Sequence, residues 1–168
     1  MTMTMTMSEP QDTAGVIAPP PLIALATLGL GLALDWLLPA YVLTVLLSFE
    51  ARIGLAVVLI VAGAALAISA ERTFREVGTD AMPWRPSRTL ATIGVYARVR
   101  NPMYVGLALL VAGIGVALAS DWTLVMLFAA AFVMHIGVVK REERYLAAKF
   151  GDAYRQYMAS VPRYGWPP

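Results

Sequence analysis

The chain of 168 residues contains no cysteine and a single histidine, His135. The absence of cysteine excludes disulfide bonds, thiolate metal sites and a cysteine nucleophile. A lone histidine also argues against a conventional transition-metal site, which draws on several nitrogen or sulfur ligands. Charge is scarce too: charged residues make up 14% of the chain, whereas 59% of the residues are hydrophobic. This balance is typical of an integral membrane protein rather than a water-soluble globule.

The scarcity of charge leaves long uncharged stretches. Residues 53–70, 102–119 and 122–139 contain no Lys, Arg, Asp or Glu, and residues 21–38 are interrupted only by Asp35. Each stretch is close to the ~20 residues that a helix needs to cross a ~30 Å hydrocarbon core. We therefore predict an all-α polytopic membrane protein with about four transmembrane helices, in a single domain over residues 19–168.

The segments between these stretches predict how the helices are connected. Because only about two residues join the third and fourth spans, these helices are expected to form a tight antiparallel hairpin. Residues 40–49 are apolar but too short to cross a bilayer, which leaves an interfacial connector and a re-entrant piece both open. Residues 78–101 form a loop of more than 20 residues with no clear periodicity, and loops of that length are usually functional or disordered.

The two ends of the chain are expected to differ. Residues 1–18 lack the positive segment of a secretory signal, and we expect them to form a disordered tail. After residue 139 the fourth helix is expected to continue to Phe150, with Gly151 as its stop. A short amphipathic helix should follow from Asp152 to Met158. It carries Tyr154 and Tyr157, which are expected as anchors at the membrane interface.

The basic residues predict the orientation. All but Arg52 lie in two regions, residues 72–100 and 140–163. The positive-inside rule places both regions in the cytoplasm, and we expect a bacterial-type inner membrane. The same clustering at membrane ends gives no basic face for nucleic acid, so membrane lipid is the expected partner.

Two polar clusters stand at the ends of the predicted hairpin. Residues 94–106 read GVYARVRNPMYVG and residues 140–145 read KREERY. Both combine charged and aromatic side chains directly beside an apolar span. Because the hairpin returns the chain to the side from which it started, the two clusters should face the same water and form one site.

An ordered set of motifs then becomes recognisable. The set comprises Gly78-Thr79, Pro83-Trp84-Arg85-Pro86, Thr89-Leu90, Gly94-Val95-Tyr96, Arg100-Asn101-Pro102-Met103-Tyr104-Val105-Gly106, Glu142-Glu143, Leu146, Phe150-Gly151, Tyr154, Tyr157 and Val161-Pro162-Arg163. It resembles the superfamily of isoprenylcysteine carboxyl methyltransferases and phospholipid methyltransferases. The resemblance implies S-adenosylmethionine as methyl donor, a cofactor pocket at the cytoplasmic face, and a lipophilic or lipidated acceptor that reaches it from the bilayer.

The resemblance also assigns residues. The family's cofactor contacts fall on Arg88, Thr89, Leu90, Ala91, Tyr96, Asn101, Pro102, Met103, Tyr104 and Glu142. Arg100, Tyr104 and Glu142 are expected at the reacting centre. Eukaryotic members have histidine at the positions of Asn101 and Arg88, and their substrate arginine corresponds to Val138. Contact with the acceptor is therefore expected from Arg141, three residues further on, with Glu143 and His135.

The chemistry of the donor suits these residue types. An arginine can pair the carboxylate of S-adenosylmethionine bidentately. Glu142 can accept hydrogen bonds from the ammonium or the ribose, and Tyr96 and Tyr104 can pack on rings. A carboxylate acceptor needs no base, whereas an ammonium acceptor must first lose a proton. Glu142, Glu143 and Tyr104 are the local candidates for that base.

Other interpretations remain open from the sequence. An NADPH-dependent membrane reductase of the sterol-reductase type shares a similar C-terminal helical region. A membrane accessory protein that retains the fold without the chemistry is the second alternative. Glu142 and Glu143 can also serve as helix-surface partners of neighbouring basic residues, and His135 can be an interhelical hydrogen-bonding residue.

Overall fold

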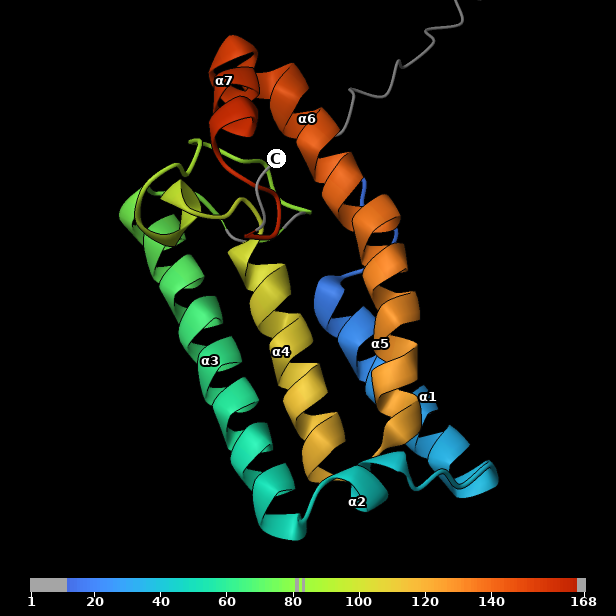
Figure 1. Ribbon diagram of the computed structural model, residues 1–168. Helices are drawn as coiled ribbons and strands as arrows, with labels where there is room; N and C mark the ends of the chain where they lie inside the picture. The colour runs from blue at the N-terminus through green and yellow to red at the C-terminus, as the bar shows by residue number, and fades with distance from the viewer. Residues whose placement is uncertain (1–11, 81, 83, 166–168) are drawn as a thin grey trace, which may run out of the picture.

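A computed structural model describes residues 12–80, 82 and 84–165, and every regular element in these ranges is a helix. Four helices stand side by side in Figure 1: α1 (Pro20–Leu37), α3 (Phe49–Glu76), α4 (Pro102–Ala117) and α5 (Asp121–Met134). α1, α3 and the continuous helix Asp121–Phe150 are long and apolar enough to cross a membrane, and α4 is a shorter apolar helix. The predicted all-α polytopic membrane architecture is confirmed.

The helix starts follow the sequence signals. α1 and α4 have proline in the first turn, where a missing N–H costs nothing. Ser48 and Ser120 cap α3 and α5, since each side-chain hydroxyl accepts a hydrogen bond from a backbone N–H three residues later. α3 is longer than the predicted span 53–70, because its polar last turns continue the helix beyond the apolar stretch.

Small residues let the helices approach closely. A Cβ on Gly63 of α3 would lie 2.7 Å from the carbonyl oxygen of Gly106 in α4, and a Cβ on Gly106 would lie 2.8 Å from that of Gly63. α1 and α5 form a second close contact, because a Cβ on Gly31 of α1 would lie 2.5 Å from the Cα of Thr123 in α5. The two helix pairs are therefore fixed by backbone proximity, as is common where membrane helices cross.

Residues 40–49 lie across one end of the bundle rather than re-entering it (Figure 1). They contain the short helix α2 (Val42–Leu46), whose residues are not buried. The backbone N–H groups of Val42 and Leu43 donate to the carboxylate of Asp121, at 2.9 and 3.0 Å. At the same end, Asp35 accepts hydrogen bonds from the hydroxyl of Ser120 and the N–H of Trp122, so its carboxylate joins α1 to α5.

The opposite end carries the polar clusters. The fourth helix changes from α5 into a π-helical segment, η2 (His135–Val139), and then into α6 (Lys140–Phe150). Gly151, with a φ of +58°, turns the chain into α7 (Asp152–Ser160). α3 with 28 residues and the continuous helix with 30 both extend past α4, which has 16. The start of α4 lies below α7 and the loop after α3 in Figure 1.

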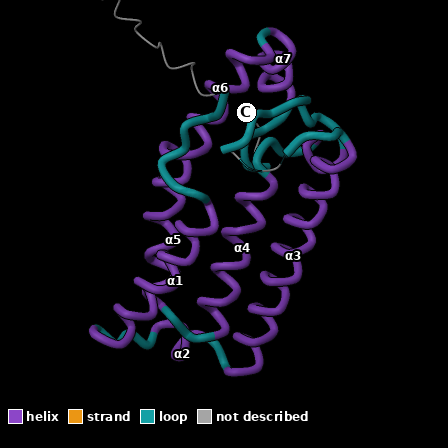
Figure 2. The backbone as a smooth tube through the Cα atoms, turned by 180° about the vertical axis from the view of Figure 1, so that it is seen from behind, coloured by secondary structure: helices purple, strands orange, loops and turns teal. Residues whose placement is uncertain are grey.

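Residues 12–18 run beside this end of the helix bundle toward α1 (Figure 2). The N–H of Ile17 donates to the carbonyl oxygen of Gly137 at 3.1 Å, and the side chain of Ile17 fills the space where Gly137 has no Cβ. Arg141 donates to the carbonyl oxygen of Gly15 at 2.7 Å. This part of the expected disordered tail is thus in contact with the helices, while residues 1–11 lie outside the described residues.

Candidate functional site

The loop after α3 and α7 lie over the start of α4 (Figure 1). The turn η1 (Gly94–Ala97) approaches α3 so closely that a Cβ on Gly94 would lie 2.7 Å from the hydroxyl of Thr73. Gly94 also has a φ of +58°, which favours glycine. The ring of Tyr96 packs on Phe74, with centroids 4.9 Å apart, and the hydroxyl of Tyr157 donates to the carbonyl oxygen of Tyr96 at 2.6 Å.

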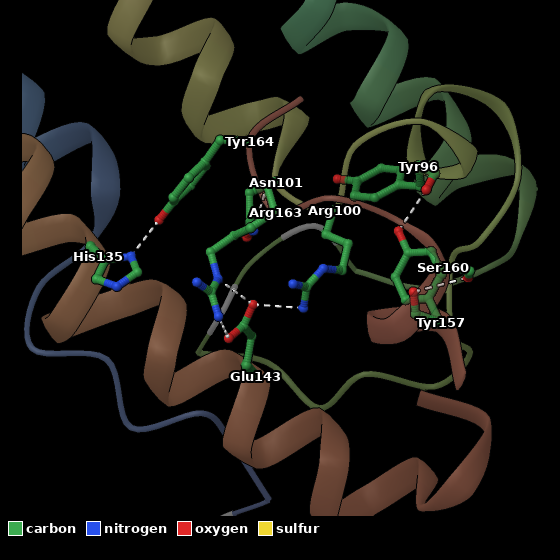
Figure 3. A network of polar contacts seen from close by, with 9 residues as sticks. All are labelled: Tyr96, Arg100, Asn101, His135, Glu143, Tyr157, Ser160, Arg163 and Tyr164. Carbon is green, nitrogen blue, oxygen red and sulfur yellow. Dashed lines mark hydrogen bonds and ion pairs between the residues drawn. The ribbon is translucent and has the colours of Figure 1, made fainter. Parts of the chain in front are cut away.

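An ion-pair network joins α6, the residues just before α4 and the C-terminal segment (Figure 3). Glu143 of α6 accepts from Nε and Nη2 of Arg163, both at 2.8 Å, and from Nη1 of Arg100 at 2.8 Å. The C-terminal segment is held further by its backbone, because Pro162 and Arg163 accept from the N–H of Arg100 and the amide of Asn101. With side chains of Arg100 and Glu143 only 8% and 12% exposed, this is a buried network.

Glu142 differs from Glu143 in its hydrogen-bond partners. Its carboxylate accepts a hydrogen bond of 2.5 Å from the hydroxyl of Tyr104, and no ion pair to it is found among the described residues. Burial raises the pKa of Glu142 to about 7; the hydrogen bond from Tyr104 opposes this rise, and the charge of Glu143 adds to it. Glu142 lies in α6, beyond the apolar span. It therefore gains and loses its proton near neutral pH.

These side chains line a polar cavity. Its charged lining residues are Asp80, Arg100, Glu142 and Glu143, so acidic groups outnumber basic ones. The Nε of Arg100 is buried and has no hydrogen-bond partner within the described part of the chain. The enclosed volume is about 90 Å³, below the ~300–1,000 Å³ typical of small-molecule sites. A cofactor-sized ligand thus requires the covering segments to move outward. Ala14 and Ser87 belong to those segments.

A second, apolar cavity of about 430 Å³ lies between α1, α4 and α5. Pro20, Ile23, Ala24 and Thr27 line it from α1, with Leu107, Val111 and Ala112 among the residues from α4 and Leu127, Ala130 and Met134 among those from α5. Tyr104 lines both cavities. The Tyr104–Glu142 pair consequently stands where a polar chamber meets an apolar one.

Most of the predicted site residues converge on the polar cavity. Its lining includes Thr89, Leu90, Ala91, Tyr96, Arg100, Asn101, Met103, Tyr104, Glu142 and Glu143. Pro102 is buried at the start of α4, outside the lining. Arg88 is exposed, and its backbone N–H donates to the hydroxyl of Thr79 at 2.9 Å. Arg141 holds the N-terminal segment, and His135 lines the apolar cavity instead.

The expectation that Tyr154 and Tyr157 are interfacial anchors is wrong. Both are buried, with their rings 6.0 Å apart, and both line the polar cavity. Burial raises the pKa of Tyr154 to about 12. Their spacing of three residues on an amphipathic helix indicated a shared face. It did not indicate whether that face meets lipid or protein, since both surroundings accept aromatic rings.

Sequence reasoning also missed residues of the C-terminal segment and of α6. Arg163 appeared in the motif without a role, and it is the bidentate partner of Glu143. Tyr164 contacts His135, with its hydroxyl 2.9 Å from Nδ1. Tyr145 accepts from the N–H of Ser87 in the loop. These contacts join segments that are far apart in sequence, and nothing local to each residue signals its partner.

Comparison with known proteins identifies the class to which this fold and site belong. A family model described as phospholipid methyltransferase matches residues 51–153, more than half of the chain. The chain therefore belongs to the phospholipid methyltransferase family. It is 34% identical over 73 residues to a protein-S-isoprenylcysteine O-methyltransferase from Schizosaccharomyces pombe. That segment is 44% of this chain and 31% of the relative, so the chain matches less than a third of the relative's length. No solved structure matches the chain significantly.

Proposed function

We propose that this membrane protein transfers a methyl group from S-adenosylmethionine to a lipophilic or amphipathic acceptor, with a prenylcysteine-type carboxylate and a phospholipid amine as the family's candidates. The observation that carries the proposal is the junction of the two cavities at Tyr104. A polar chamber that holds the carboxyl of Glu142, without an ion-pair partner among the described residues, suits a cationic, water-soluble donor, and an apolar chamber suits a lipophilic acceptor. Family membership supports the same reaction.

The lining of the polar cavity fits S-adenosylmethionine. The unpartnered Nε of Arg100 is a buried donor for the carboxylate of the ligand. Glu142 is a buried acceptor for its ammonium or ribose hydroxyls, and Leu90, Ala91 and Tyr96 offer an apolar and aromatic surface for adenine. When bound, the cofactor supplies a methyl group on a sulfonium, and Glu142 is the lining carboxylate that has no ion-pair partner among the described residues and can face its positive charge.

The chain's own residues have two tasks in this reaction. The first is to exclude water and align the reactants, which supplies much of the acceleration in a displacement of this kind. The loop, α7 and residues 12–17 cover the chamber for this purpose. The second is to receive a proton from an acceptor that carries one. Tyr104 lines both cavities, and its hydroxyl donates to Glu142, whose pKa of about 7 suits a general base at neutral pH.

The charge of the chamber argues against the reductase alternative. NADPH carries several phosphate charges, and phosphate sites gather arginines and lysines. Here Arg100 is the one basic residue among the lining residues described, and Glu143 already pairs with it. The chamber therefore lacks the group of basic side chains that such a ligand needs.

We place the site on the cytoplasmic side of a bacterial-type inner membrane. Both groups of basic residues, 72–100 and 140–163, belong to the end of the bundle that carries the cavity, while Arg52 stands near the opposite end. The positive-inside rule favours this orientation.

The test uses purified protein with methyl-labelled S-adenosylmethionine and a total lipid extract, followed by identification of the labelled product. We expect label in an amphipathic lipid, and its loss in Glu142→Gln and Tyr104→Phe but not in Glu76→Gln, which changes an exposed carboxylate outside the site. Saturable binding of NADPH without binding of S-adenosylmethionine would overturn the proposal. Cofactor binding without transfer to any lipid or to an uncharged lipophilic acceptor would identify a non-catalytic accessory protein.

A further inference from the structure

The apolar cavity has a polar end. None of its lining residues is Lys, Arg, Asp or Glu. Apart from Thr27, its hydrogen-bonding side chains are Tyr104, His135 and Tyr164. Thr27 is satisfied within its own helix, because its hydroxyl donates to the carbonyl oxygen of Ile23 at 2.8 Å. The polar groups therefore gather where the start of α4, the π-helical segment and the C-terminal segment meet.

His135 and Tyr164 form a fixed pair at this end. Nδ1 of His135 lies 2.9 Å from the hydroxyl of Tyr164, and the rings are 6.0 Å apart (Figure 3). Tyr164 directly follows Arg163, which Glu143 holds with two hydrogen bonds. Nδ1 of His135 is thus occupied, whereas Nε2 makes no hydrogen bond within the described part of the chain.

The cations nearest to this pair lie outside the lining of the apolar cavity. Arg163 and Arg100 both pair with Glu143, and Lys140 is exposed outside the lining. A phosphate or carboxylate in this cavity would lack a counter-charge, and an unpaired buried ion costs several kcal/mol.

We propose that His135 and Tyr164 bind the head of an acceptor that is apolar and carries a single uncharged hydroxyl, thiol or amine. This inference rests on the proposed methyl transfer and narrows its substrate class away from phospholipids and prenylcysteine carboxylates. The cavity of about 430 Å³ lies within the range of small-molecule sites. Its apolar walls take the body of the molecule, and the two side chains take its one polar group.

The chemistry balances with the groups present. The acceptor heteroatom forms a bond to the methyl carbon as the bond between that carbon and sulfur breaks, and the electron pair stays on sulfur. The proton of the heteroatom passes to the hydroxyl of Tyr104, which gives its own proton to Glu142. His135 and Tyr164 are positioning residues in this step, since they hold the head without receiving the proton.

A single histidine makes the proposal directly testable. Protein containing isotope-labelled histidine, purified through a histidine-free affinity tag, gives one imidazole spectrum, that of His135. We expect an alkylphenol, added in detergent solution with S-adenosylhomocysteine present, to shift the imidazole nitrogen signals saturably. A prenylated cysteine and phosphatidylethanolamine at the same concentrations should leave them unchanged. Shifts caused by either charged lipid, with none from the alkylphenol, would overturn the proposal.

Variants separate recognition from folding. Tyr164→Phe removes one hydroxyl and keeps the histidine reporter. We expect about a fivefold rise in the dissociation constant of the alkylphenol, the equivalent of one hydrogen bond. Cofactor affinity should not change. Tyr41→Phe makes the same change at an exposed site at the other end of the bundle and should have no effect. An unaltered alkylphenol affinity in Tyr164→Phe contradicts the proposed recognition. Binding of the alkylphenol without methylation would refute the proposed methyl transfer to this acceptor but would support the proposed binding site.

Discussion

Replacement of Glu142 by glutamine gives the sharpest test of the polar cavity. The change keeps the size of the side chain and removes its ability to ionise. Burial raises the pKa of Glu142 from 4.5 to about 7. At ~1.4 kcal/mol per pKa unit this rise corresponds to about 3–4 kcal/mol, which is the order of the cost of ionising this carboxyl in the folded protein.

The sign of the effect on folding follows from proton binding. Between pH 4.5 and about 7 the folded state retains the proton that the unfolded state has lost. Stability therefore falls as the pH rises through this window and is level above it. We expect Glu142→Gln to lose this decline. Thermal unfolding in detergent at several pH values between about 4.5 and 8 measures it, with Glu76→Gln as the matched exposed control.

The effect on ligand affinity has the opposite sign. If the cation of S-adenosylmethionine binds the ionised carboxylate, affinity should be level above pH 7 and fall about tenfold per pH unit below it. Glutamine should weaken binding at pH 8 and make it independent of pH. Calorimetric titration at pH 6, 7 and 8 decides the matter. A wild-type affinity that does not vary with pH, or an equal variation in the variant, would refute the role given to Glu142.

Three further changes probe the scaffold. Glu143→Gln leaves two arginines of the buried network without a counter-charge, and we expect a loss of about 3 kcal/mol in denaturant titration. Gly106→Leu forces α4 away from Gly63 and should lower the free energy of unfolding by about 1–3 kcal/mol in the same titration. Gly29→Leu places its side chain in open space and should leave the free energy of unfolding unchanged. Tyr157→Phe removes the hydrogen bond to the turn before α4 and should cost about 1 kcal/mol in thermal unfolding.

The fold was largely predictable because its signals are local. Uncharged runs gave the spans, Pro20 and Pro102 marked two helix starts, and the short connection, residues 118–120 in the structure, fixed the hairpin. The π-helical segment His135–Val139 was not predictable. This segment lies at the end of an apolar run whose composition suits an α-helix equally well. Its contact with Ile17 also depends on a segment that is distant in sequence.

The site was predictable in part. The resemblance identified ten lining residues of the polar cavity because they share short motifs at fixed spacing. It gave no information on which carboxylate is paired. Glu142 and Glu143 are adjacent in sequence, yet one meets a tyrosine and the other two arginines. That difference arises because consecutive residues of α6 point to different neighbours, and only the packed structure shows which.

The unequal lengths of the helices bear on where an acceptor would react. α4 rises about 24 Å, whereas α3 rises about 42 Å and the continuous helix about 45 Å. In the proposed reaction, an acceptor dissolved in the acyl chains would meet the start of α4 by lateral diffusion, without being extracted into water. Extraction would cost ~0.8 kcal/mol for every methylene exposed. Turnover should accordingly follow the concentration of the acceptor within the lipid phase rather than its solubility in the surrounding buffer.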